Sequence, residues 1–392
     1  MNQEADKTIS ILVTGDFSLT GRIEGSCKHY GHERIYGNAL PVLLNKDISI
    51  TNLECPLTDA AGCVDKSGPS LKAGRECAAA IKAGGFDIAA LANNHIMDQG
   101  AAGLAQTISA CHGAGIQTVG AGENLEAAQK PLYRAVKGTT VAIVNCAEYE
   151  FSIATPDSAG ANPLDPIDAY HQIQEAKKKA DLVLVIVHGG HEYYPLPSPR
   201  MIKTCRFFAD LGAAAVIGHH THSPSGYEVY NGVPIFYSLG NFIFDWKNHH
   251  HDAWYEGYFV TLTITGSRVV DFVLHPYTQC KKDACLDMME GIERQRFMER
   301  INKYSGEIPD AEAMEQRFQE FCEARGMEYL PVILSFGRIK RKLFKLGLYG
   351  GGRKRAHLLR LLNLFRCQAH KDVSVKVLES WLARIKRGSG RC

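Results

Sequence analysis

Several short apolar runs of the sequence are followed directly by residues that can bind a divalent metal ion. Oxygen and imidazole ligands suit a pair of divalent cations, which lower the pKa of a bound water and hold an anionic oxygen between them. Such a pair needs a bridging carboxylate, and Glu54 is the natural bridge. The candidate residues are Asp16, Glu54, Asn94, His95, His188, His219, His220 and His222.

Each of these short motifs also has a purely structural interpretation. His220-Thr221-His222 is a weak signal by itself, because some histidine pairs simply decorate a protein surface. His188-Gly189-Gly190 fits a strand end capped by a tight turn, and Asn93-Asn94-His95 fits an Asx turn that enters a helix. These local explanations do not account easily for all the motifs together, which favours a metal site.

Short apolar strands that alternate with helices would position these residues. In an open α/β sheet the ligand crevice lies outside the carboxyl ends of the strands, so the polar strand ends should meet at one rim. The sequence therefore predicts an α/β fold. The predicted strands are 9–14, 48–52, 88–91, 140–145, 182–187, 214–217 and 234–237, the predicted helices are 75–83, 103–114, 170–180 and 201–211, and an antiparallel pair, 255–265 and 269–275, turns at Gly266-Ser267.

Length and composition indicate one large domain with an appendage. The chain has 392 residues, of which 45% are hydrophobic and 22% charged, so it can bury a core and is not disordered, collagenous or a coiled coil. After Pro276 the sequence becomes charged and helix-favouring from 281 to 325, and Gly350-Gly351-Gly352 precedes a last basic stretch. We expect a first domain over residues 1–280 and a helical, basic extension over residues 281–392.

The charge is divided unevenly between these two parts. Residues from Ser335 onward carry a net charge of +14, whereas residues 1–334 carry −12. The basic segment fits contact with an anionic membrane, contact with nucleic acid, a helix with a solvated face, or docking onto the acidic body. Nucleic acid is disfavoured, because the acidic body would repel it and few aromatic residues are available for base stacking. The apolar residues of the segment are Leu358, Leu359, Leu361, Leu362, Leu364, Phe365, Val375, Leu378, Trp381, Leu382 and Ile385.

Cysteine usage and the N-terminal residues bear on location. The 12 cysteines form no CxxC pair and no tight disulfide framework, which favours reduced thiols in the cytoplasm. The first apolar run, residues 11–13, is too short for a signal peptide or a membrane span. We expect a cytoplasmic protein that can lie at the inner face of the membrane.

Residues 8–280 contain a series of six short motifs in a fixed order. These are Gly15-Asp16, Asn52-Leu53-Glu54-Cys55-Pro56-Leu57-Thr58, Asn93-Asn94-His95 with Asp98 and Gly100, His188-Gly189-Gly190-His191-Glu192-Tyr193, Gly218-His219-His220-Thr221-His222 and Tyr237-Ser238-Leu239-Gly240-Asn241-Phe242. The series is similar to that of the CapA family, the poly-gamma-glutamate and capsule synthesis proteins with a PGA_cap domain, and that domain is similar to the calcineurin-like metallophosphoesterases. The resemblance implies a layered αββα sandwich and a role in making a capsule or extracellular polymer.

The same resemblance implies a role for each site residue. Asp16 and His222 would bind a first metal, and Glu54 would bridge the two metals. The second metal would be bound by Asn94, His188 and His220, while His95 would act on the substrate as a general acid. One or two divalent ions are expected, and nitrogen and oxygen ligands admit Mn, Fe, Zn or Mg.

Two departures from the family pattern change these expectations. Metallophosphoesterases usually open with Asp-x-His, but the third position here is Ser18, so the first metal should bind more weakly. Capsule-family members often begin with a membrane anchor, whereas this sequence starts directly at its first predicted strand. Its location is therefore expected to differ from theirs.

Other polar residues are weaker candidates. Arg22 could neutralise an anionic substrate or simply be a solvated surface residue. Glu192 is expected near the substrate, as a carboxylate that orients the His188 imidazole or as an acid at a helix N-terminus. His249, His250 and His251 fit a flexible polar loop better than a further metal site.

The expected chemistry is metal-assisted hydrolysis or transfer on an anionic substrate, with a phosphoester and a glutamyl amide as the two candidates. One alternative is a non-catalytic assembly or polymer-handling component of a capsule machine, which the loss of histidine at Ser18 favours. Another is an intracellular metallophosphoesterase unrelated to capsule.

Overall fold

The predicted strands separate into two β-sheets in the computed structural model, which describes residues 8–246, 249, 251–326, 328–329 and 351–388. The first sheet has the order β16-β15-β14-β1-β2-β3-β4, with β13 also paired to β1, and the second has the order β11-β12-β10-β9-β7-β6. A small third sheet pairs β5 (Ala121–Gly122) with β8 (Gly160–Ala161). The strands of the first sheet are β1 (Thr8–Ser18), β2 (Ile48–Leu53), β3 (Ile88–Ala90), β4 (Gln117–Val119), β13 (Asn241–Phe244), β14 (Glu256–Thr265), β15 (Arg268–Gln279) and β16 (Leu286–Met288). The strands of the second sheet are β6 (Leu132–Val136), β7 (Thr139–Ala147), β9 (Leu182–His188), β10 (Ala215–His219), β11 (Tyr227–Tyr230) and β12 (Val233–Phe236).

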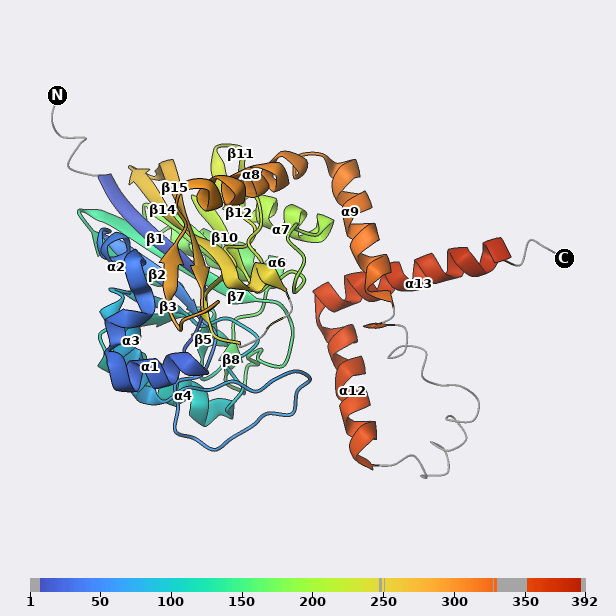
Figure 1. The fold of residues 1–392 in the computed structure, drawn as a ribbon, viewed down its shortest axis with the longest axis horizontal. Helices are drawn as coiled ribbons and strands as arrows, with labels where there is room; N and C mark the ends of the chain where they lie inside the picture. Colours follow the sequence, from blue (N-terminus) through green and yellow to red (C-terminus); the bar gives the residue numbers. More distant parts are fainter. Residues whose placement is uncertain (1–7, 247–248, 250, 327, 330–350, 389–392) are drawn as a thin grey trace.

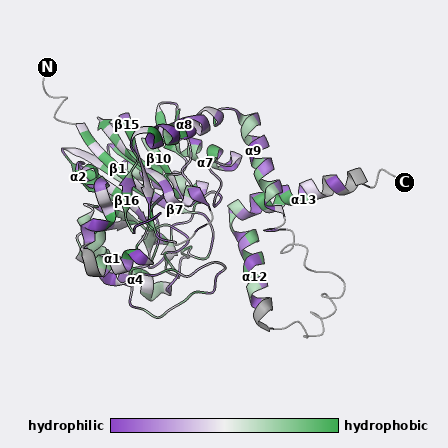
Figure 2. Ribbon diagram, viewed as in Figure 1, coloured by the Kyte–Doolittle hydropathy of each residue, from purple (hydrophilic) through white to green (hydrophobic). Residues whose placement is uncertain are grey.

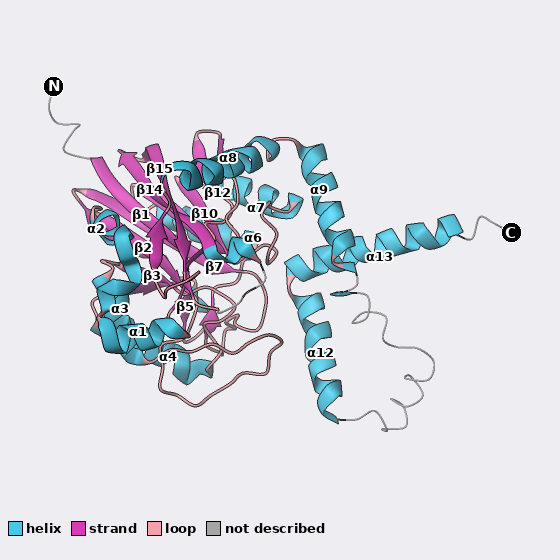
Figure 3. Ribbon diagram, viewed as in Figure 1, coloured by secondary structure: helices cyan, strands magenta, loops and turns pink. Residues whose placement is uncertain are grey.

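Helices cover the outer face of each sheet (Figures 1 and 3). One group packs on the first sheet: α1 (Arg22–Tyr30), η2 (His32–Ala39), α2 (Leu40–Leu44), η3 (Arg75–Cys77), α3 (Ala78–Ala83) and α4 (Gly100–Gly113). The others are α5 (Leu125–Ala128), α6 (Pro166–Lys177), α7 (Pro199–Asp210), η4 (Asp252–Tyr255), α8 (Gly291–Glu307), α9 (Ala311–Ala324), α12 (Gly351–Arg366) and α13 (Gln368–Gly388), of which α6 and α7 pack on the second sheet.

Strand β9 shows why the sheets form two central layers. Its side chains alternate between the two faces of the sheet, as in any β-strand. Leu184 and Ile186 contribute to the core between the sheets, whereas Val183 and Val185 contribute to the core under the helices. All four are buried apolar residues because both faces of this parallel strand are covered. Figure 2 shows hydrophobic residues both in the strands and in the helices that cover them. The predicted αββα sandwich is confirmed.

The body of the molecule continues beyond the predicted boundary at residue 280. Strand β16 pairs with β15, with Tyr277 opposite Met288, and α8 places Phe297 and Ile301 in the core between the sheets. Residues 281–307 therefore belong to the body. The boundary was misplaced because the charged residues that α8 exposes outnumber its few buried apolar ones.

The C-terminal helices pack on the second sheet's side of the body. Phe318 of α9 and Val373 and Val377 of α13 are buried in one core with α6 and α7. Beyond the body, helices are present at residues 311–324 and 351–388, and α12 begins at Gly351, inside the predicted glycine break. Gly350 and the start of the basic segment, 335–350, lie outside the described residues.

Ion pairs join the basic extension to the acidic body and to α9. Asp372 of α13 pairs with Arg200 of α7. Lys376 and Arg384 of α13 pair with glutamates of α9. A hydrogen bond adds to these contacts, because His191 Nε2 lies 2.8 Å from the Ala369 carbonyl oxygen. For residues 351–388 the structure thus shows docking onto the body. Among the helices that the structure describes, none is long and apolar enough to cross a membrane.

The packing of α9 against the body predicts that truncation of its buried Phe318 side chain lowers the stability of the protein. Phe318 is 3% exposed and its ring lies 5.0 Å from that of His191. Phe318→Ala should lower the free energy of unfolding by about 3–5 kcal/mol, because truncating a buried aromatic residue loses transfer free energy and leaves a cavity. The matched control is Phe365→Ala, since Phe365 is 71% exposed, and this change should stay within about 0.5 kcal/mol. Equal effects in urea unfolding would show that α9 is not part of the core.

Candidate metal centre

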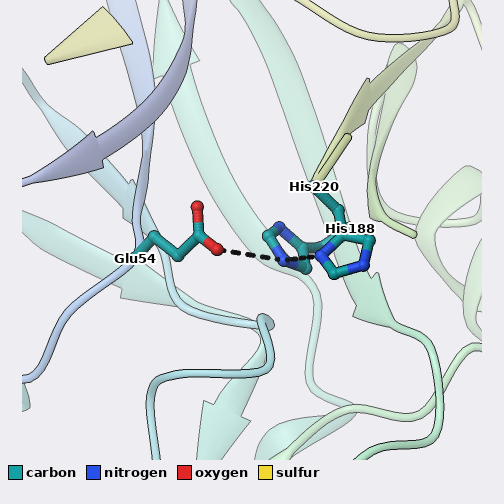
Figure 4. Close-up of side chains that lie close together, drawn as sticks. All are labelled: Glu54, His188 and His220. Atoms are coloured by element: carbon teal, nitrogen blue, oxygen red, sulfur yellow. Dashed lines mark hydrogen bonds and ion pairs between the residues drawn. The ribbon is translucent and has the colours of Figure 1, made fainter. Parts of the chain in front are cut away.

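The carboxyl ends of parallel strands from both sheets bring the predicted ligands together. Asp16 of β1 lies opposite Asn52 of β2, and His188 of β9 lies opposite His219 of β10. Glu54 follows β2 directly, so its side chain meets residues that lie far along the chain. Figure 4 shows Glu54 pointing from one side of this rim toward His188 and His220 on the other.

One group of four ligands converges on the Nε2 atom of His188. This atom lies 3.0 Å from Asn94 Oδ1, 3.0 Å from His220 Nδ1 and 3.5 Å from Glu54 Oε1. The ligand atoms of Glu54, His188 and His220 all lie within 4.8 Å of one another. These are the four residues that the sequence assigned to the second metal.

A second group consists of Asp16, Glu54 and His222, whose ligand atoms also lie within 4.8 Å of one another. His222 Nδ1 is 3.6 Å from Asp16 Oδ2, and His222 Nε2 is 3.9 Å from Glu54 Oε1. These are the residues assigned to the first metal, and Glu54 is common to both groups. The structure brings all six residues together, and their role as metal ligands stays a prediction.

The Glu54 carboxylate shows that this cluster fits a cation. Its side chain is 0% exposed, and neither oxygen has a hydrogen-bond partner in the part of the chain that the structure describes. Burial, and then the nearby Asp16 carboxylate, raise the pKa of Glu54 well above its ordinary value. An unpaired buried carboxylate is costly, and a divalent cation between the two groups would remove that cost.

The histidines of the cluster also suit a metal. Burial lowers the pKa of His188 well below its usual value and lowers that of His220 to about 4. Both imidazoles are therefore neutral near pH 7, the form that donates a ring nitrogen to a metal.

Two asparagines hold the ligands in place, although the sequence analysis gave them no role. Asn52 donates to Asp16 Oδ1 at 2.7 Å and lies 3.2 Å from His188 Nδ1. Asn241 accepts from His222 Nδ1 at 2.8 Å, which leaves Nε2 of that ring for the metal. Partners of this kind orient metal ligands and tune their basicity. The sequence did contain a signal for both: Asn52 lies in the same motif as the predicted ligand Glu54, and Asn241 lies in the motif of residues 237–242.

Backbone strain is concentrated in the loop that carries two of the ligands. His220 has φ 91° and His222 has φ 53°, values in a region that non-glycine residues rarely adopt. The His220 amide donates to Asp16 Oδ2 at 3.1 Å, which helps to hold this conformation.

Close packing beside the cluster requires a glycine at position 15, because a Cβ atom on Gly15 would lie 1.9 Å from the Gly240 carbonyl oxygen.

His95 lies beside the cluster but belongs to neither ligand group. Its Nδ1 atom lies 2.7 Å from Asp98 Oδ2 and 3.2 Å from Lys66 Nζ, so Nε2 is left for the cleft. Burial lowers the pKa of His95, although Asp98 acts in the opposite direction. Asp98 belongs to the motif that begins with Asn93-Asn94-His95, whereas nothing in the local sequence indicated that Lys66 would contact His95.

A cleft of about 330 Å³ opens in front of His95. The body lines one side and the C-terminal helices line the other. Lining residues are Lys66, Asn94, His95, Glu150 and Glu192 from the body, and Arg325, Glu328, Tyr329, Arg360, Asn363 and His370 from the C-terminal part.

Arg22 has structural partners in the described residues, and its predicted role in substrate binding stays a prediction. Its guanidinium donates to the Asp245 carboxylate at 2.7 Å and to the carbonyl oxygens of Cys280 and Lys282. Asp245 raises the pKa of Arg22, which keeps the ion pair charged. The arginine thus ties α1 to the segments after β13 and β15.

Glu192 lines the cleft, but it does not orient His188, whose Nδ1 atom faces Asn52. Burial by itself would raise the pKa of Glu192, but the imidazoles of His222 and His220 outweigh burial and lower it. Glu192 is therefore an ionised carboxylate at the cleft, and a role in substrate binding stays a prediction.

The remaining candidates have structural surroundings. His219 lies with Nε2 2.9 Å from the Thr14 carbonyl oxygen, and the Ser18 hydroxyl lies 3.1 Å from that of Thr20. His249 stacks on Trp254 at 4.3 Å and His251 stacks on Tyr193 at 4.4 Å, in an aromatic cluster. His250 lies outside the described residues.

Comparison with known proteins places this centre within a matched region. Residues 10–246 match the family described as bacterial capsule synthesis protein PGA_cap. The chain is 35% identical over 249 residues to a capsule biosynthesis protein CapA of Bacillus anthracis, a match that covers 61% of each protein. It is 34% identical over 246 residues to the PGA biosynthesis protein CapA of Bacillus subtilis strain 168, covering 62% of this chain and 64% of that protein. The match thus spans less than two thirds of these relatives.

Among solved structures, the fold is similar to that of a 5′-nucleotidase from Candida albicans SC5314. The TM-score is 0.41 and the identity is 12%, over 77% of this chain and 58% of that one.

The unequal ligand groups predict unequal metal affinities. The group around His188 offers four protein ligands, whereas the group around Asp16 offers three because Ser18 stands where an imidazole is expected. A calorimetric titration with Mn²⁺ should therefore show one tight and one weak site. Asn94→Ala should weaken only the tight step and His222→Ala only the weak step, because each ligand belongs to one group.

The exposed His112→Ala variant is the control and should leave both steps unchanged. Two equally tight sites, or no binding, would contradict the ligand assignment.

Proposed function

The chain belongs to the bacterial capsule synthesis protein PGA_cap family, and we propose that it is a metal-dependent hydrolase or transferase in the production of a capsule or poly-gamma-glutamate type polymer. The observation that carries this proposal is the pair of candidate ligand groups that share the Glu54 carboxylate, which has no hydrogen-bond partner among the residues that the structure describes. A centre with a shared carboxylate is the arrangement that two-metal hydrolysis needs.

The site residues of this chain would have two kinds of role, metal binding and proton donation. Asp16, Glu54 and His222 would hold one divalent ion, and Asn94, His188 and His220 with Glu54 would hold the other. When bound, such ions supply an activated water and neutralise an anionic oxygen of the substrate. His95 in its doubly protonated form, with Nδ1–H held by Asp98, would donate the Nε2 proton to the leaving group as a general acid.

One cation of the cleft, Arg360, supports an anionic substrate. Lys66 pairs with Asp98, and Arg325 pairs with Glu328 at 3.1 Å. Arg360 lines the same cleft and forms no ion pair with any described residue. Its guanidinium is free to bind a phosphate or carboxylate group that extends beyond the metals, as in a phosphoester or a glutamyl amide.

A non-catalytic role in assembling or handling polymer is the second candidate. Ser18 in place of a histidine favours it, because the group around Asp16 then has three ligands. A role as an intracellular metallophosphoesterase unrelated to capsule is the third candidate, and the substrate screen below separates it from the first.

Turnover is tested by screening the Mn²⁺-loaded protein against phosphoesters and gamma-glutamyl amides. His95→Ala should reduce kcat on any accepted substrate by about 10²–10⁴-fold, the usual contribution of a general acid. Metal content should stay unchanged, because His95 is not a ligand.

The exposed His171→Ala variant is the control and should keep full activity. Loss of metal from His95→Ala would reverse the assigned roles, and the absence of turnover on every substrate would favour the non-catalytic role.

For location, we propose the cytoplasm, with peripheral contact to the anionic inner face of the membrane. Support comes from helix α12, where Leu358, Leu362 and Phe365 follow each other at helical spacing and are 46%, 41% and 71% exposed. Leu364 on the other side of α12 is buried, and Leu378 of α13 packs against the core. The side chains of Leu382 and Ile385 lie outside the described part. Basic residues beside the exposed stripe would add about 1 kcal/mol each near an anionic leaflet.

The full chain should therefore sediment with phosphatidylserine-rich vesicles at low salt. Binding should weaken as salt rises, because exposed charges are screened within about 10 Å at 0.1 M. The double variant Leu362→Asp, Phe365→Asp should bind several-fold more weakly. Ile167→Asp, on an equally exposed residue of α6, should bind like the native chain. Equal sedimentation of all three proteins, or none, would remove the membrane proposal.

A further inference from the structure

A second cluster of metal ligands lies where the C-terminal helices meet the body. The ligand atoms of Glu150, Cys367 and His370 all lie within 4.8 Å of one another. Glu150 lies just after β7 in the body, Cys367 connects α12 to α13, and His370 lies in the first turn of α13. We propose that these three residues form a separate zinc-type metal site that fastens the C-terminal helices over the cleft.

The chemistry of this cluster differs from that of the centre around Glu54. A thiolate, an imidazole and a carboxylate are the ligands that Zn²⁺ prefers, and three protein ligands leave one position open. The six residues around Glu54 contribute no sulfur. Cys367 and His370 also lie far outside residues 10–246, which match the capsule family.

The surroundings of the cluster have unsatisfied polar groups. Asn363 is 7% exposed, its Oδ1 atom has no hydrogen-bond partner among the described residues, and it lines the same cleft as Glu150 and His370. A small cavity of about 30 Å³ adjoins Cys367 and His370. A cavity of this size holds about one or two water-sized groups, which is enough for a cation or its water ligand.

The charges of the cluster also favour a cation. Cys367 donates its thiol to Glu148 Oε2 at 3.8 Å, and Glu150 Oε1 lies 3.8 Å from His220 Nε2. Burial raises the pKa of Glu150 to about 8 and that of the Cys367 thiol well above its ordinary range. Glu148 is already paired with Arg200, so a divalent cation would balance the charges of the Glu150 carboxylate and the Cys367 thiolate. Binding would release the thiol proton to solvent as the thiolate forms.

The orientation of His370 is already set for such a site. Its Nδ1 atom lies 2.7 Å from the Tyr329 hydroxyl, which leaves Nε2 as the ligand atom. A hydrogen bond to the other ring nitrogen is the usual partner of a metal-bound histidine. Because Tyr329 belongs to the C-terminal part, a metal here would link α12, α13 and the segment after α9 to the body.

Cobalt provides a test that does not depend on activity. Co²⁺ bound to a thiolate gives an intense charge-transfer absorption, which oxygen and nitrogen ligands do not give. The full-length protein saturated with Co²⁺ should show this band, and Cys367→Ser should lose it while it keeps the cobalt of the centre around Glu54. Cys322→Ser is the matched control, because Cys322 is a buried thiol of α9 outside the cluster, and this variant should keep the band.

Two further variants keep the test decisive if Cys367→Ser folds poorly by circular dichroism. Glu150→Gln and His370→Ala retain the thiol, and each should raise the Kd for the cobalt that gives the band by about tenfold or more, since even partners of ligands change metal affinity by about 10–100-fold. Absence of the band in the saturated native chain, or a band that survives Cys367→Ser, would overturn the proposal. The absorption band measures cobalt at the Cys367 site, whereas total cobalt content also measures the centre around Glu54. The two measurements together therefore distinguish a missing Cys367 site from a missing centre around Glu54.

Discussion

The burial of one carboxylate without a hydrogen-bond partner is the constraint on which the site depends. Glu54 is 0% exposed, and both of its oxygens lack partners among the described residues. In water or beside a donor the carboxylate would be stable, but in this position burial raises the pKa of Glu54, and the ionised form needs a nearby cation to compensate the lost solvation. Both candidate ligand groups contain Glu54, so two metal ions bound there would be coupled through one residue.

The two-sheet architecture makes this arrangement possible. Asp16 and Glu54 come from the first sheet, whereas His188 and His220 come from the second, and the core between the sheets holds the two rims together. Asn52 contacts ligands from both sheets and thereby fixes their relative position. The left-handed backbone of His220 and His222 is maintained only because the surrounding structure is rigid.

The C-terminal helices are part of this system and not merely a tail. Lys376 and Arg384 of α13 pair with glutamates of α9, and Asp372 of α13 pairs with Arg200 of the body. Apolar residues of α13 are buried in the core that also contains α6 and α7. These helices form one wall of the cleft in front of His95. The cleft lies between the two parts, so the helices are placed to influence what reaches His95.

The sequence by itself determined the elements and the types of ligand. Local apolar patterns predicted the strands, and the polar residues that follow them, from Asp16 to His222, identified the rim, because each signal lies within a few residues of the chain. Tertiary structure decided what depends on distant contacts: that Asn52 orients His188, that Arg22 pairs with Asp245, and that α8 belongs to the body. It also decided that Arg360 and His370 return to the cleft, more than 200 residues after Asn94. No local pattern encodes such meetings, because they arise from the packing of whole layers against one another.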